Sequence, residues 1–150
     1  MHPSLHEAVS QRLLDANLTL TFHTTDSPAG STHEYDTHTM GRFVCPNRLC
    51  GARGWTSKKV AVTIRMYPGG EYNARVYHQR CRACHRLARP VLDASYAERV
   101  AYRLKRWCGV GELVGPGLGS WTGGRAGRRS DVPHESWLCE GCRVGRFIVE

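Results

Sequence analysis

The sequence predicts a small α+β fold with a central antiparallel sheet, and three observations lead to this prediction. Two runs, 60–67 and 72–78, alternate apolar and polar residues on either side of Pro68-Gly69-Gly70, as the two strands of a hairpin do. Two other segments carry apolar residues at helical spacing. Six of the seven cysteines occur in close pairs, a pattern that binds small folds together where the apolar core is limited.

The remaining elements follow from capping and turn signals. Ser4 to Glu7 fits a capping box, which predicts a short helix over about 4–15. A brief alternation predicts a strand over 18–22, and the Thr-, Ser-, Pro- and Gly-containing stretch 24–37 predicts a loop. A second capping box, Ser95 to Glu98, opens a helix that ends near Trp107. The eight glycines of residues 109–130 predict a flexible loop.

The charge distribution divides the chain. The net charge of +8 is the sum of −4 over residues 1–40, +12 over 41–110 and 0 over 111–150. We therefore expect an acidic N-terminal extension, 1–40, that carries the first helix and strand. A basic, cysteine-containing domain follows over 41–147. Such a basic segment favours a polyanionic ligand such as nucleic acid.

The cysteine spacing predicts a zinc site. Cys45 and Cys50 precede the hairpin, and Cys81 and Cys84 follow it, so the hairpin brings the two pairs together as in a zinc ribbon. Pairs two to four residues apart let each turn offer two thiolates to one tetrahedral Zn²⁺. The alternatives are buried unliganded thiols, a c-type haem at the CxxCH run 81–85, and a redox pair. Complete pairing as disulfides is excluded, because seven cysteines are an odd number.

Several segments together resemble a known family, the three-CxxC zinc-finger domain. They are Gly41 to Cys45, Gly54 to Ser57, Tyr77 to Cys84, and Pro133 to Gly145. This domain occurs in receptor-transporting proteins, in zygote-arrest RNA-binding proteins and in compact fungal proteins, and the similarity is closest to the fungal members. The resemblance implies a zinc-ribbon fold with one zinc at the first site.

The resemblance also implies a second zinc held by His134, Cys139, Cys142 and a final cysteine. In this chain Phe147 stands where that last cysteine is expected. We hypothesise that Cys108, just after the second predicted helix, supplies the missing ligand. The alternative is a buried Cys108 beside a weak, three-ligand second site.

The predicted function is binding of RNA or single-stranded nucleic acid through an arginine-rich surface. The candidate contacts are Arg99, Arg103, Lys105 and Arg106 on the second helix, with Lys58, Lys59 and Arg75 on the hairpin. We expect Trp55, Trp107 and Trp137 to pack around the cysteine pairs. The alternative function is a protein-interaction adaptor or chaperone-like role, as the receptor-transporting relatives suggest.

Other function classes lack a sequence signal. The H-x-E and P-C-x-x-C signature of zinc deaminases is absent, and a four-cysteine site has no open position for a substrate. We therefore expect a protein that is not an enzyme; a zinc hydrolase would need a three-coordinate second site with a bound water. No stretch has the roughly 18 apolar residues of a membrane span, and no secretory signal opens the chain. We expect an intracellular protein of the cytoplasm or nucleus.

Overall fold

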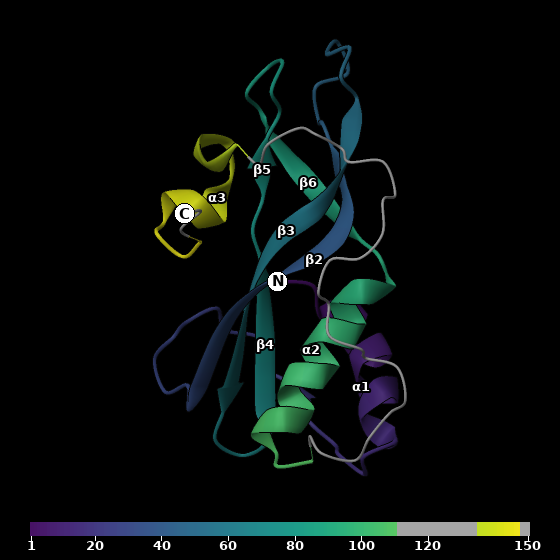
Figure 1. Cartoon of the computed structure of the whole chain (residues 1–150), viewed down its shortest axis with the longest axis vertical. Coiled ribbons are helices and arrows are strands. Elements are labelled where there is room, and N and C mark those ends of the chain that lie inside the picture. The colour runs from purple at the N-terminus through teal and green to yellow at the C-terminus, as the bar shows by residue number, and fades with distance from the viewer. Residues whose placement is uncertain (111–134, 148–150) are drawn as a thin grey trace, which may run out of the picture.

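The fold is built on a six-stranded sheet with helices on both of its faces (Figure 1). A computed structural model describes residues 1–110 and 135–147. The elements in chain order are η1 (Pro3–Leu5), α1 (His6–Leu14), β1 (Thr21–Phe22), β2 (His33–Val44), β3 (Gly54–Tyr67), β4 (Glu71–Val76), β5 (Gln79–Arg80), β6 (Leu87–Leu92), α2 (Ala94–Trp107), η2 (Ser136–Leu138) and α3 (Glu140–Arg143). The predicted α+β class is confirmed. Most of the predicted glycine-rich loop, from residue 111 onward, lies outside the described residues.

The long β2–β3 hairpin is the spine of the sheet. The strand order is β1-β4-β3-β2-β6-β5, and every pairing is antiparallel except that of β1 with β4. At about 3.4 Å per residue, the fourteen residues of β3 span roughly 45 Å. One half of the hairpin packs against α1 and α2, and the other half extends beyond them (Figure 1).

The expected loop over 24–37 is wrong from residue 33 onward, where β2 begins. His33 pairs with Met66, and the ladder continues to Val44 opposite Gly54. Polar residues such as Asp36 and Thr37 form a strand here because β3 supplies hydrogen bonds along their whole length. This is a tertiary effect that local propensity does not reveal.

One face of the sheet carries the apolar core. Val60, Val62 and Ile64 of β3 alternate toward α1 and α2 and are fully buried. From α2, Val100 and Leu104 close the same core, so the predicted amphipathic helix is confirmed. Its cap is Asp93, whose carboxylate accepts the N–H of Ser95, and not Ser95 itself. The capping box expected at Ser4 is also absent, because neither η1 nor α1 has a side-chain cap.

The first forty residues belong to this core as well. Val9 and Leu13 of α1 and Leu20, just before β1, are buried in the same cluster as β3. The boundary expected at residue 40 falls inside β2. The structure therefore does not separate residues 1–40 from the zinc-binding part of the chain.

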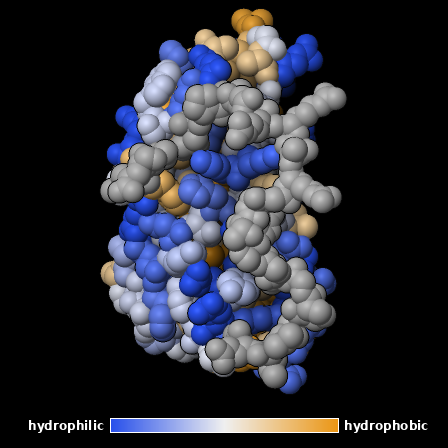
Figure 2. Space-filling model, viewed as in Figure 1, coloured by the Kyte–Doolittle hydropathy of each residue, from blue (hydrophilic) through white to orange (hydrophobic). Residues whose placement is uncertain are grey.

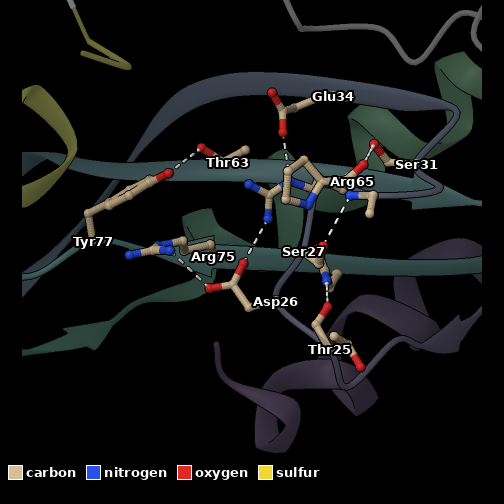
Figure 3. Close-up of polar contacts among 12 residues, drawn as sticks. Thr25, Asp26, Ser27, Ser31, Glu34, Thr63, Arg65, Arg75 and Tyr77 are labelled. Carbon is tan, nitrogen blue, oxygen red and sulfur yellow. Dashed lines mark hydrogen bonds and ion pairs between the residues drawn. The ribbon is translucent and has the colours of Figure 1, made fainter. Parts of the chain in front are cut away.

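The opposite face of the sheet carries a network of buried and half-buried charges (Figure 3). Arg65 of β3 is only 3% exposed, and it donates to Glu34 (2.6 Å) and to Asp26 (2.8 Å). Arg75 of β4 pairs with Asp26 and with Glu140 of α3. Because its members come from the 24–32 segment, the sheet and α3, the network fastens that segment and α3 to this face.

No helix among residues 1–110 and 135–147 is long and apolar enough to cross a membrane.

Candidate metal centre

Two turns form the metal centre at the end of the sheet that extends beyond α1 and α2. Cys45 and Cys50 lie in the turn between β2 and β3, and Cys81 and Cys84 lie in the turn between β5 and β6. β2 pairs with β6 from Gly41 opposite Leu92 to Val44 opposite Arg89. This pairing places the two turns side by side (Figure 1, top).

The four thiols have the geometry of a tetrahedral site. Cys45 Sγ lies 3.5 Å from Cys84 Sγ, and Cys50 Sγ lies 3.7 Å from Cys81 Sγ. All four sulfur atoms lie within 4.8 Å of one another. A tetrahedron with Zn–S bonds of about 2.3 Å has S···S edges of about 3.8 Å, so the donor set fits one zinc ion.

The thiols differ in acidity because their backbone surroundings differ. A hydrogen bond from the backbone of Arg86, reinforced by the other thiols, lowers the pKa of Cys84 to about 7. A backbone hydrogen bond from Asn47 acts in the same direction on Cys45. There, burial and the neighbouring thiols prevail and raise the pKa to about 12. Four ionised thiolates this close need a cation between them, which Zn²⁺ supplies.

The site is closed. Cys45, Cys50 and Cys81 are buried, Cys84 is half-buried, and Trp55 packs against the cluster. A haem or a redox pair would use two thiols alone, whereas four converge here. Unliganded burial of four crowded thiols leaves this tetrahedral arrangement without a cause. The geometry therefore favours a structural zinc with no open coordination position.

The third cysteine pair lies on the charged face of the sheet. Cys139 is buried in a small cluster with Ala61, Tyr77 and Phe147, and Cys142 packs beside it. The Phe147 ring stands edge-on to Tyr77 at 5.8 Å. The side chain that replaces the expected final cysteine therefore contributes apolar packing at this position.

The hypothesis that Cys108 completes a second site with Cys139 and Cys142 is corrected by the fold. Cys108 ends α2, which packs on the apolar face of the sheet, and Cys139 lies against the other face. His134 lies outside the described residues. In the part of the chain that the structure describes, the first site is the one group of three or more metal-ligand side chains.

The predicted basic contacts are scattered, and some are already engaged. Arg75 makes two ion pairs, and the Arg103 guanidinium lies 3.3 Å from the centre of the Tyr35 ring. Arg106 donates to the Tyr102 hydroxyl. Of the other candidates, Arg99 is exposed and Lys105 half-buried on α2, whereas Lys58 and Lys59 are exposed on β3 toward the zinc centre.

The structure reveals a larger basic surface at the zinc centre. Residues 41–60 and 78–92 build this end of the molecule, and we call their solvent-accessible side chains the zinc-end surface. The two segments contain nine Lys and Arg and no Asp or Glu, and of the nine only Arg80 is half-buried. The nine are Arg42, Arg48, Arg53, Lys58, Lys59, Arg80, Arg82, Arg86 and Arg89. The absence of acidic residues from both segments was a sequence signal for this surface.

The expectation that the tryptophans pack around the cysteine pairs is confirmed for Trp55, which packs against the thiols of the metal centre. Trp107 instead packs against the apolar core and stacks on His33. Trp137 of η2 is instead 58% exposed.

Comparison with known proteins gives one match. No curated protein and no solved structure is detectably similar to the chain. The model of a zinc-binding domain, the three-CxxC zinc ribbon, matches residues 38–145. That range contains both turns of the metal centre and the third cysteine pair. The chain therefore belongs to the three-CxxC zinc-ribbon family, and its four-cysteine centre is a zinc site.

Proposed function

We propose that this zinc-binding domain binds nucleic acid through its zinc-end surface. The observation that carries the proposal is the charge of residues 41–60 and 78–92, nine basic side chains against no acidic one. Within the described residues only Arg82 of the nine makes an ion pair, with Glu135. Four thiolates around one Zn²⁺ offset only part of this charge. Basic groups that are not held in ion pairs are available to phosphates.

The strand register aligns several of these groups on one face. Along β6, Leu87, Arg89 and Val91 point to the same side of the sheet, because side chains alternate. Arg42 is paired with Val91, and Arg80 with Leu87. Arg80, Arg89 and Arg42 therefore follow one another over about 14 Å, the length of four residue steps of β6.

A groove lies across the strands at this end. It has a volume of about 460 Å³, and its lining includes Arg42, Lys58, Met40 and Val91. Figure 2 shows hydrophilic side chains around this end of the molecule, with a small apolar tip over the β2–β3 turn. The groove's one carboxylate, Asp93, caps α2 by accepting the N–H of Ser95. A groove that presents Arg42 and Lys58 suits a phosphate backbone.

The proposal moves the interface away from α2. Arg103 and Arg106 have partners within the domain, and their release would cost part of the binding energy. The resemblance to the three-CxxC family also supports nucleic acid as the ligand, because a distant form of this domain occurs in the zygote-arrest RNA-binding proteins.

We also propose that the domain is not catalytic and acts inside the cell. A closed four-thiolate zinc supports a structural role for the metal. Free thiols at zinc ligands suit a reducing compartment. The adaptor alternative would bind a protein through an apolar patch, with little dependence on salt.

The test is a fluorescence-anisotropy titration of the zinc-loaded protein with single-stranded RNA, duplex RNA and duplex DNA at several salt concentrations. The variant carries Arg42→Gln, Lys58→Gln and Arg89→Gln. For single strands we expect the slope of log affinity against log salt to fall by up to about 2, at ~0.7 per lost phosphate contact.

The matched control removes three positive charges from α2 instead, through Arg99→Gln, Lys105→Gln and Arg106→Gln. We expect a smaller loss of affinity and an equal zinc content in both variants. The proposal fails if the wild type binds none of the three nucleic acids at low salt, or if the α2 variant weakens binding more than the zinc-end variant.

A further inference from the structure

We infer that Trp137 is a stacking platform for an unpaired base, so that the zinc-end surface selects single strands over duplexes. This inference rests on the proposed function and specifies its substrate class. Trp137 is 58% exposed, whereas Trp55 and Trp107 pack against the core. An exposed indole ring beside a basic surface is the feature that single-strand binding proteins use to stack bases.

Contacts with the zinc turn 81–86 and with β5 hold the Trp137 ring in place. The imidazole of His85, in the zinc turn 81–86, stands edge-on to the indole of Trp137 with ring centres 5.6 Å apart. The next residue, Leu138, is buried, and Cys139 forms a β-bridge with Gln79. Arg82 in the same zinc turn pairs with Glu135. These contacts order the backbone around the ring before a ligand arrives, which lowers the entropy cost of binding.

A groove lined by Leu138, the residue after Trp137, suits a base with its phosphate. Its volume is about 290 Å³, and its apolar lining is Leu87, Leu138 and Val144. Arg80 and Arg143 line the same groove and make no ion pair within the described residues. Its one carboxylate, Glu140, is occupied by Arg75 and by the backbone N–H of His78. The groove therefore offers apolar surface to a base and positive charge to a phosphate.

The groove continues into the row of Arg80, Arg89 and Arg42, so a single strand could follow both. Leu87 lines the groove, and Arg89 and Arg42 continue from it along β6 on the same face of the sheet. A strand whose base stacks on Trp137 can thus place its following phosphates on these arginines. In a duplex the bases are already stacked and paired, so they present no free face to an indole ring.

The experiment compares three ligands of equal length: a 12-nucleotide single-stranded RNA, an abasic deoxyribose-phosphate strand, and duplex RNA. Trp137→Ala should weaken binding of the base-containing single strand by about 5- to 150-fold, the range that ~1–3 kcal/mol per stacked base gives. It should leave the abasic strand and the duplex within about twofold of the wild type. Trp137→Phe, which keeps a ring, should recover part of the loss.

The matched control is Leu49→Ala at the tip of the zinc-end surface, where the leucine is 97% exposed but has no ring. We expect no change with any ligand. Zinc content and thermal midpoint should equal those of the wild type in both variants, which separates stacking from misfolding.

Equal binding of the single strand by Trp137→Ala and wild type would overturn the stacking role. The nucleic-acid proposal would survive that result if the zinc-end charge variant still lost its salt slope. An equal loss with the abasic strand would also overturn stacking, because a base-free ligand cannot stack. Absence of wild-type binding to all three ligands would overturn both proposals.

Discussion

Replacing Cys81 by serine tests whether the zinc stabilises the two turns at the end of the β2–β3 hairpin that extends beyond α1 and α2. Cys81 is fully buried, and its Sγ lies 3.7 Å from that of Cys50. Serine leaves three thiolates, one short of the closed tetrahedron that a structural zinc requires. We expect the variant to bind one zinc ion fewer per chain than the wild type.

The magnitude follows from what else is buried there. Around the thiols, the cluster contains Trp55 as its one other apolar side chain among the described residues. Burial of an aromatic side chain contributes on the order of 3 kcal/mol, whereas a structural zinc contributes roughly 10–16 kcal/mol. The metal therefore dominates the stability of the two turns. By contrast, the apolar core under α1 and α2 has many fully buried side chains of its own.

We therefore expect local rather than complete unfolding of Cys81→Ser, measured by hydrogen exchange. The turn amides of Cys45, Cys81 and His85, which are hydrogen-bonded within the two turns, should lose protection. The amides of Val62 and Ile64, at the core, should stay protected. Zinc content by mass spectrometry checks the metal loss in parallel.

Cys108→Ser is the matched control, because this thiol lies outside the cluster at the end of α2. It should keep the wild-type zinc content and exchange pattern. Full zinc content or unchanged turn protection in Cys81→Ser would refute the reasoning, as would an equal loss of zinc in the control.

Three further predictions concern the sheet and its two faces. Leu104→Ala, at a fully buried position, should lower the free energy of unfolding by about 2–5 kcal/mol because it opens a cavity in the core; a change below about 1 kcal/mol in denaturant unfolding would contradict this packing. Gly41→Ala should destabilise the protein by about 1–3 kcal/mol, because a Cβ there would lie 2.7 Å from the Val91 carbonyl oxygen. Gly51→Ala is the control and should leave the thermal midpoint unchanged, because a Cβ there meets nothing within 4 Å. Equal midpoints of the two variants would show that β2 and β6 do not approach each other this closely. The pKa of Glu34 lies below its ordinary value of 4.5, because hydrogen bonds from Arg146 and Arg65 outweigh the opposing effect of burial. Its stabilising effect is thus fully present above pH 4.5 and is lost as the pH falls through the lower, folded-state pKa. Glu34→Gln should therefore differ most from wild type in unfolding free energy at neutral pH and least in acid, and a difference that grows on acidification would refute the assignment.

Local sequence patterns predicted the metal centre and the main elements for a physical reason. Two cysteines in one tight turn fix the direction of two thiolates over a few residues, so spacing alone identifies Cys45, Cys50, Cys81 and Cys84. The alternation of Val60, Val62 and Ile64 is equally local. The strand β2 was missed over 33–37, because it lacks an apolar alternation: Glu34 and Asp36 face the charged network, and its backbone hydrogen bonds come from β3.

The basic residues show the limit of this reasoning. Arg75 and Arg103 look identical in sequence to free surface arginines. In the structure Arg75 is neutralised by Asp26 and Glu140, and Arg103 covers Tyr35. Their acidic and aromatic partners lie 49 to 68 positions away in the sequence, so only the tertiary structure reveals the contacts.

The amino-acid sequence is enough to identify an α+β zinc-binding domain with a basic central segment, because ligand spacing, periodicity and charge are local properties of the chain. Which groups share a surface follows from the tertiary fold. It placed Cys108 and Cys139 on opposite faces of the sheet, joined residues 41–60 with 78–92 into one basic end, and left Trp137 exposed beside that end. Each of these outcomes depends on pairing between distant segments, and a side chain's face and neighbours are fixed only when that register is fixed.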